Sequence, residues 1–147
     1  MKKFLAFALL FVSFVSYHAE AQVVTIPNKS KDHLAKKYPG ATHTVWDNNV
    51  ASYTCRFTWK NGEYKAFYHM DGTWDYSVHY LTESTLPKAV QDAVAKSRIS
   101  DWKPKSAVKL ENNKGEHLYR VERKKGIEIM YLFFDEKGKE VKSSMAI

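Results

Sequence analysis

The sequence predicts an α+β protein built from tandem helix-plus-β-meander repeats. Two short helix patterns are each followed by three or four strand patterns and tight turns. The strand patterns of the first half alternate apolar and polar residues, as expected where one face of a sheet is buried. The second half of the chain also matches the first when the sequence is shifted so that Asn48 falls on Asn112.

The residues that match under this shift fall at predicted turns, where backbone geometry constrains the sequence most strongly. Asn49 aligns with Asn113, Gly62 with Gly126, and Asp71 with Asp135. This agreement predicts a duplication. We therefore expect one domain over residues 22–147, made of two repeats over about 22–82 and 83–147.

The first repeat opens with a helix from Asn28 to Tyr38, which either Asn28 or Ser30 can cap and which Pro39-Gly40 ends. Strands follow, and turn residues separate them. The predicted strands are Thr42–Trp46, Tyr53–Trp59, Glu63–Met70 and Thr73–Tyr80, with turns at Asp47–Asn49, Asn61-Gly62 and Asp71-Gly72.

Alternation along these strands predicts which side chains are buried. A two-residue loop at Asn61-Gly62 pairs Trp59 with Tyr64. It also gathers one apolar face, made of Tyr53, Cys55, Phe57, Trp59, Tyr64, Ala66, Tyr68 and Met70.

The next loop decides where a second set of apolar side chains lies. A three-residue loop at Asp71-Gly72, with Gly72 at positive φ and a bulge, places Trp74, Tyr76, Val78 and Tyr80 on the apolar side. The alternative is that these side chains are exposed, which would itself point to a function.

The second repeat opens with a helix from Leu86-Pro87 to Ser97 that carries a narrow apolar stripe. One of its predicted strands, Ile127–Phe134, is apolar on both faces. Its Tyr131 and Phe133 side is either an apolar patch on an open sheet or is covered by a loop or by the arm Val23–Ile26. The predicted strands are Ala107–Leu110, Leu118–Arg123, Ile127–Phe134 and Glu140–Met145, with turns at Lys125-Gly126 and Glu136–Gly138.

Residues 1–21 match a secretory signal peptide, with a basic start, a short apolar core and an Ala19-Glu20-Ala21 cleavage site. An uncleaved anchor is the alternative. Cleavage near Ala21-Gln22 predicts a periplasmic or secreted protein with no later membrane span. It also removes two lysines and one glutamate, so 21 basic and 15 acidic side chains remain, a net charge of +6. Export argues against nucleic acid as a partner.

Several segments of the sequence resemble the beta-lactamase-inhibitor-like, PepSY-like periplasmic proteins. They are residues 33–41 with Val45-Trp46, residues 64–74, residues 86–90 and residues 133–139. The resemblance implies a PepSY-like domain whose repeats form an antiparallel sheet with helices on one face. It also implies a non-enzymatic role in the cell envelope. It brings no catalytic residues, and likeness to an inhibitor does not itself show inhibition.

The sequence contains no recognisable group of catalytic residues. Cys55 is the only cysteine, and its predicted apolar surroundings indicate an inert thiol. The histidines form no two-ligand metal motif, and the chain has no glycine-rich phosphate loop or serine hydrolase signature. We therefore expect no enzymatic activity, no cofactor and no metal. A hydrolase with dispersed catalytic residues is the remaining enzymatic hypothesis.

The leading hypothesis is a binding module that docks a protein or peptide on the sheet face away from the helices. An inhibitor-like activity is part of this hypothesis. Mixed aromatic and arginine side chains are typical of interface anchors. The alternative is a binder of anionic envelope ligands, such as lipid head groups or acidic glycans, which rests on the net charge. The candidate partner-binding residues are Arg56, Lys65, Phe67, His69, Arg120, Tyr131 and Phe133.

Overall fold

The protein is described here by a computed structural model over residues 25–142, so the predicted signal peptide lies outside the described residues. The same is true of residues 143–147. The elements, in chain order, are α1 (Asn28–Lys37), β1 (Thr42–Asn49), β2 (Ser52–Trp59), β3 (Gly62–His69), β4 (Trp74–Leu81), the 3₁₀ turn η1 (Glu83–Thr85), α2 (Lys88–Ala95), β5 (Lys103–Asn112), β6 (His117–Lys125), β7 (Glu128–Phe134) and β8 (Glu140–Val141).

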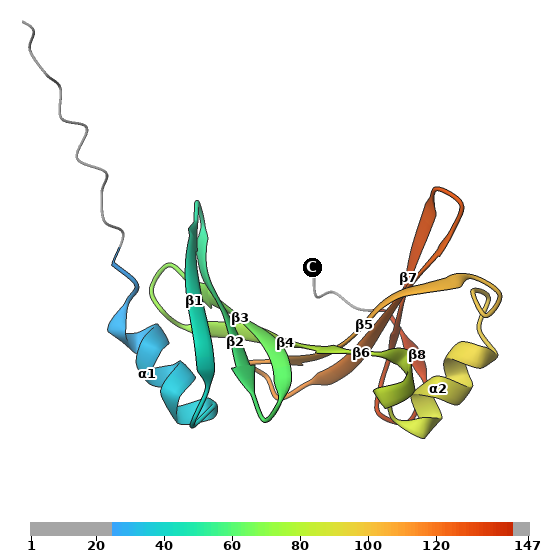
Figure 1. Ribbon diagram of the computed structural model, residues 1–147, viewed down its shortest axis with the longest axis horizontal. Coiled ribbons are helices and arrows are strands. Elements are labelled where there is room, and N and C mark those ends of the chain that lie inside the picture. The colour runs from blue at the N-terminus through green and yellow to red at the C-terminus, as the bar shows by residue number, and fades with distance from the viewer. Residues whose placement is uncertain (1–24, 143–147) are drawn as a thin grey trace, which may run out of the picture.

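The described strands form one antiparallel sheet in the order β1 to β8, so each strand pairs with its neighbours in sequence. The sheet is strongly bent. The β1–β2 and β6–β7 hairpins rise on either side, and both helices lie below the sheet (Figure 1). The predicted α+β fold, an antiparallel sheet with helices on one face, is confirmed. We call the side that carries the helices the helix face, and the opposite side the open face.

A helix followed by four strands occurs twice along the chain. The spacing between corresponding elements is not constant. It is shorter between the starts of the two helices, Asn28 and Lys88, than between the starts of the last strands of each half, Trp74 and Glu140. A single shift of the sequence therefore aligns only part of the two halves.

The first turn of α1 is fixed by a tertiary contact. Pro27 occupies the N-cap position, and no side chain caps the helix. The expectation that Asn28 or Ser30 would cap it is therefore wrong. The buried Ser30 hydroxyl instead donates to the carbonyl of Gly72, at 3.2 Å. The Ser30 hydroxyl, which was predicted to cap the helix, thus connects the helix to the β3–β4 loop.

The loops after β3 and β7 have the same form. Each contains three residues, 70–72 or 136–138, and the flanking residues close it through a backbone hydrogen bond. The third residue of each loop is a glycine at positive φ, +81° at Gly72 and +79° at Gly138. The sequence predicted this geometry at Gly72 and a turn at Glu136–Gly138.

Both glycines lie where a helix approaches the sheet. A Cβ atom on Gly72 would lie 2.9 Å from the Cβ of Pro27, and one on Gly138 would lie 2.3 Å from the carbonyl oxygen of Ala89. Any side chain at these positions would push the helix away. The two glycines therefore set how closely α1 and α2 pack.

The pairing register of the β2–β3 hairpin differs from the prediction by two residues. Its turn is Lys60-Asn61, both at positive φ, and Trp59 pairs with Gly62 instead of Tyr64. A shift of two residues leaves every side chain on its original face. The predicted apolar face is therefore confirmed as buried at Tyr53, Cys55, Phe57, Ala66 and Tyr68, whereas Met70 lies exposed in the next loop.

Strand β4 contains the bulge, but its effect was predicted wrongly. Tyr68 pairs with Trp74 and Phe67 pairs with Tyr76, so Asp75 is an extra residue. Trp74 lies on the helix face as expected. Beyond the bulge the parity reverses, which sends Tyr76, Val78 and Tyr80 to the open face.

Other boundaries differ only locally. Asp47–Asn49 belongs to β1, and the turn falls at Val50-Ala51. The β6–β7 turn is Gly126-Ile127 instead of Lys125-Gly126. Helix α2 follows Pro87 and ends at Ala95, two residues before the predicted end.

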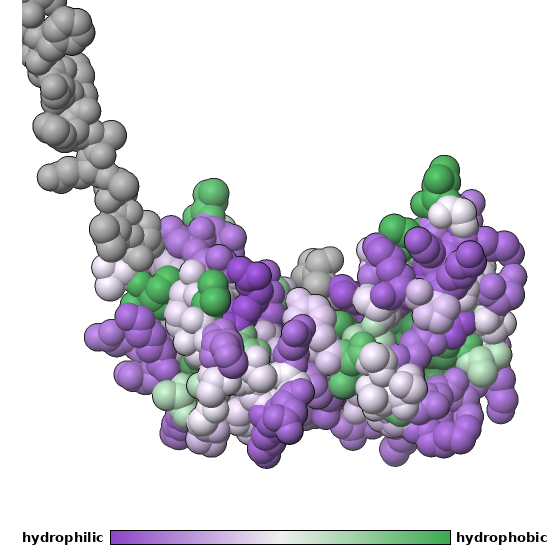
Figure 2. Space-filling view, in the orientation of Figure 1, coloured by the Kyte–Doolittle hydropathy of each residue, from purple (hydrophilic) through white to green (hydrophobic). Residues whose placement is uncertain are grey.

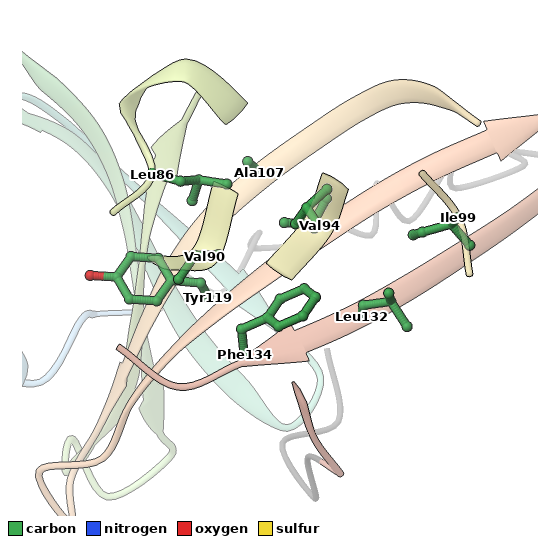
Figure 3. Packing of buried hydrophobic residues seen from close by; sticks show 9 residues of the cluster. Leu86, Val90, Val94, Ile99, Ala107, Tyr119, Leu132 and Phe134 are labelled. Carbon is green, nitrogen blue, oxygen red and sulfur yellow. The ribbon is translucent and has the colours of Figure 1, made fainter. Parts of the chain in front are cut away.

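Each helix covers a separate core on the helix face. In the first half, Leu34 and Tyr38 pack on aromatic side chains of β2 and β3. In the second half, Val90 and Val94 pack on Val121, Leu132 and Phe134 (Figure 3). Between the two cores, neither α1 nor α2 covers the centre of the sheet at β4 and β5 (Figure 1).

We predict that Gly138→Ala destabilises the protein far more than Gly126→Ala. Both glycines have positive φ, which costs alanine about 1 kcal/mol. A Cβ on Gly126 meets nothing within 4 Å, whereas one on Gly138 overlaps backbone of α2. The free energy of unfolding from urea titration should fall by roughly 3 kcal/mol or more for Gly138→Ala. Equal losses in the two variants would show that the approach of α2 to Gly138 is unimportant.

Candidate functional site

The open face has a continuous apolar floor where the two halves meet. Residues directly opposite in an antiparallel pair share a face. Val78 pairs with Leu110, and Val108 pairs with Arg120. Val78, Val108 and Leu110 are at most 3% exposed. The partly buried Phe67, Tyr76, Leu118 and Phe133 surround them.

The structure places all seven predicted site residues on this face. In the first half, Arg56 pairs with Lys65, and Phe67 and His69 follow Lys65 at alternate positions of β3. In the second half, Arg120 pairs with Phe133, and Tyr131 is the next residue of β7 on the same side. The residues therefore line both sides of the apolar floor.

Aromatic rings and cations are interleaved here. The rings of Phe67 and Tyr76 stack with centroids 4.2 Å apart, and Lys65 Nζ lies 5.0 Å from the Phe67 centroid. The Arg120 guanidinium lies 5.4 Å from the ring centroid of Tyr131, a residue that is 47% exposed. Such contacts hold the long cationic side chains over ring faces.

Some charges on this face are already neutralised. Arg56 lies 3.5 Å from Asp47, and Lys105 lies 2.5 Å from Glu122. Burial opposes ionisation of Glu122, but hydrogen bonds from Lys105 and Ser106 outweigh it and keep the pKa of this carboxyl below its usual value. Glu122 is thus held as a carboxylate that is already paired.

Other polar groups on the face lack partners. Within residues 25–142, neither Lys65 nor Arg120 forms an ion pair. Arg120 Nε and Thr54 Oγ1 are buried and have no hydrogen-bond partner in that range. An unsatisfied buried polar atom costs about 1–3 kcal/mol, so the face is less stable than one in which both atoms are paired.

A hollow of about 270 Å³ lies beside Arg56, lined by Val45, Thr58, Glu63 and Tyr80. Farther out, the two raised hairpins carry aliphatic side chains at their tips. Val50 and Ile127 are fully exposed there, and Figure 2 shows both tips as apolar caps. A bound partner can contact these tips as well as the floor.

The prediction left open whether an N-terminal arm covers Tyr131 and Phe133. Ile26, within the described part of that arm, packs against the core of the first half, on the helix face. Ile129 and Tyr131 are 46% and 47% exposed. In the described structure Ile129 and Tyr131 therefore form an exposed apolar patch, whereas Phe133 is partly buried against the floor.

Sequence reasoning missed part of this site. Tyr76, Val78 and Tyr80 reach it only because of the bulge at Asp75, and Val108 and Leu110 form its floor from a strand predicted only as a short segment. Apolar alternation alone cannot reveal an unpaired residue inside a strand. The sequence predicted a bulge next to Gly72, but it did not predict that the extra residue would be Asp75, inside β4.

No group of three or more His, Cys, Asp or Glu residues that could hold a metal ion occurs within residues 25–142. His33 instead contacts Tyr68 Oη at 3.2 Å and stacks on Trp74. Burial and the charge of Lys37 lower its pKa. No helix in the described range is long and apolar enough to cross a membrane.

Comparisons with known proteins identify related folds. The sequence matches no family model and no curated protein. A BLIP-like protein from Bacteroides fragilis superposes with a TM-score of 0.76 at 24% identity, covering 82% of this chain and 86% of that chain.

Two further solved structures agree. A candidate periplasmic protein from Bacteroides eggerthii has a TM-score of 0.71 at 21% identity, over 80% of this chain and 87% of that one. A DUF2874 family protein from Bacteroides ovatus has a TM-score of 0.73 at 18% identity, over 80% and 86%. At these identities the likeness shows a shared fold, which is the fold that the sequence resemblance implied.

Cys55 lies in the first-half core and is 0% exposed. Burial raises the pKa of its thiol to about 12. At pH 8 the thiolate fraction would then be about 10⁻⁴, against roughly a tenth in the unfolded chain. We predict that a thiol reagent labels the native protein at least roughly 1,000-fold more slowly than the protein in urea. Rapid labelling of native protein would contradict a buried, inert thiol.

Proposed function

We propose that the protein is a non-enzymatic binding module of the cell envelope, inhibitor-like in that it docks a protein or peptide on the open face of its sheet. One observation carries this proposal. Seven side chains chosen from the sequence share one face around an apolar floor, and two of them, Lys65 and Arg120, lack ion partners within residues 25–142. The envelope location rests on the predicted signal peptide, with cleavage near Ala21-Gln22.

The composition of the face favours a protein partner. The centres of protein interfaces are enriched in aromatic residues and arginine, and anchors of this kind lie in desolvated surroundings. Arg120 fits this description because its guanidinium lies over Tyr131 and its Nε is buried. The apolar tips at Val50 and Ile127 extend the contact surface beyond the floor.

The folds of similar proteins support the same proposal. The Bacteroides fragilis protein is described as BLIP-like and the Bacteroides eggerthii protein as a candidate periplasmic protein. A non-enzymatic role in the envelope agrees with both descriptions. The partner of this chain is a separate question, because proteins of one fold bind different molecules.

Site-specific photo-crosslinking in cells tests the docking face. A photoreactive phenylalanine analogue is placed at Phe67 or Tyr131 on the open face, and at Lys36 or Lys96 on the helix side as matched controls. We expect the two open-face positions to yield an adduct of the same mass and the controls to yield none. The same adduct from all four positions, or from the controls alone, would refute the assignment.

With the crosslinked partner purified, we predict that Phe67→Ala and Tyr131→Ala each weaken binding by at least about 2 kcal/mol, or roughly 30-fold. Arg120→Ala should have a similar effect, since it removes a cation from the centre of the face. Lys96→Ala, in an exposed residue beyond α2, should leave the dissociation constant unchanged. Titration calorimetry measures all four values, and unchanged binding by the first two variants would exclude the aromatic anchors.

A further inference from the structure

A second cavity lies on the helix face, in the gap between the two helices. It has a volume of about 190 Å³ and lies over the junction of β4 and β5. Sites for drug-sized ligands are about 300–1,000 Å³, so this cavity suits a smaller molecule of about one ring. It shares no wall with the apolar floor of the open face, because the sheet separates them.

Aromatic rings form one wall of this cavity, and contacts between them fix their positions. The centroids of Tyr38 and Trp59 are 5.2 Å apart, and those of Trp59 and Tyr64 are 5.7 Å apart. The indole N–H of Trp59 donates to the carbonyl of Pro39 at 3.0 Å. A ring wall held in this way needs little ordering when a ligand binds. Tyr64 is already stacked between Phe57 and His79, so Trp59 is the ring of this wall whose negative face attracts the C–H groups of a ligand.

The other wall is polar, and its lysine is held only by a loose ion pair. Lys37 Nζ lies 2.6 Å from Glu111 Oε1, which neutralises that carboxylate. Lys109 is only loosely paired, at 3.6 Å from the exposed Glu136. His79 is directly opposite Lys109 on β4, and within the described residues its ring stacks on Tyr64 without a hydrogen bond of its own. An anion between Lys109 and His79 would accept from both side chains and would compete with Glu136 for Lys109.

Glu111 adds a group that accepts hydrogen bonds. Its second carboxylate oxygen, Oε2, receives no hydrogen bond from residues 25–142. A ligand hydroxyl can donate to it, whereas a ligand without hydroxyls would leave it unpaired. The cavity thus combines a ring-stacking wall, a site for one carboxylate and an acceptor for hydroxyl groups.

We infer that this cavity binds an acidic monosaccharide, that is, a sugar ring carrying one carboxylate. The ring packs against Trp59, the carboxylate contacts Lys109 and His79, and a ring hydroxyl donates to Glu111. This site is independent of the proposed docking face. It gives a location to the anionic-ligand hypothesis, which the net charge alone could not locate.

The test is a titration of the isotope-labelled protein with glucuronate, followed by NMR resonances of the His79 ring and the Trp59 indole. We expect saturable shifts with a dissociation constant on the order of 1 mM, as is usual for a ligand of this size. Glucose lacks the carboxylate and acetate lacks the ring, so each should bind at least tenfold more weakly. Benzoate binding as tightly as glucuronate would show that hydroxyl groups do not matter and would overturn the sugar assignment.

Two variants and a control locate the site. Lys109→Met and Trp59→Ala should each raise the dissociation constant at least tenfold, and Lys103→Met, at the far end of the same strand, should not change it. Lys109 is not in either core, so we expect the Lys109→Met variant to remain folded. No saturable shift at about 50 mM glucuronate, or unchanged affinity in Lys109→Met, would overturn the inference. Lys109→Met should leave crosslinking through Tyr131 intact, which separates this site from the docking face.

Discussion

The structure depends on how closely each helix can approach the sheet. Helices α1 and α2 have ten and eight residues, and each is covered on one side by a three-residue loop that ends in a glycine at positive φ. At Gly72 and Gly138 a Cβ atom would lie 2.9 Å and 2.3 Å from atoms of the neighbouring helical segment. Both helices cover the same face of the sheet (Figure 1). The opposite face of eight strands is left to bury its apolar side chains against one another, as Val108 and Leu110 do beneath Phe67 and Phe133.

The sequence predicted the sheet face of each side chain better than the pairing register of the strands, and the reason is geometric. Alternation along a strand depends on parity, so an error of two residues at Asn61-Gly62 left Cys55 and Tyr68 correctly buried. A single unpaired residue, Asp75, was enough to reverse the side chains that follow it in β4. The candidate residues Arg56, Lys65 and Phe67 were brought together correctly because they lie on two strands joined by one short turn. Arg120 and Phe133 were grouped correctly for the same reason.

Contacts between distant parts of the chain were beyond prediction. Lys37 and Glu111 are 74 residues apart, yet their ion pair neutralises the carboxylate in the cavity between the helices. Arg123 is another example, since its buried guanidinium binds Glu83 and the carbonyl oxygens of Ile99 and Ser100. Nothing in local sequence marks such partners, because they meet only when both halves are in place. The helix-face cavity therefore could not be found from the sequence, whereas the open face could.

The order of the strands has a consequence for the folding reaction. Every described strand pairs with its neighbour in sequence, so all the hairpins form between nearby segments, and proteins with local contacts fold faster than those with distant strand pairings. The halves are joined within the sheet by one ladder, from Tyr76 opposite Asn112 to Leu81 opposite Ala107. The chain between those strands holds α2, so this ladder closes the longest loop in the sheet. Pairing of β4 with β5 therefore has the largest loop-closure cost in the sheet, and the same pairing creates both the open-face floor and the cavity behind it.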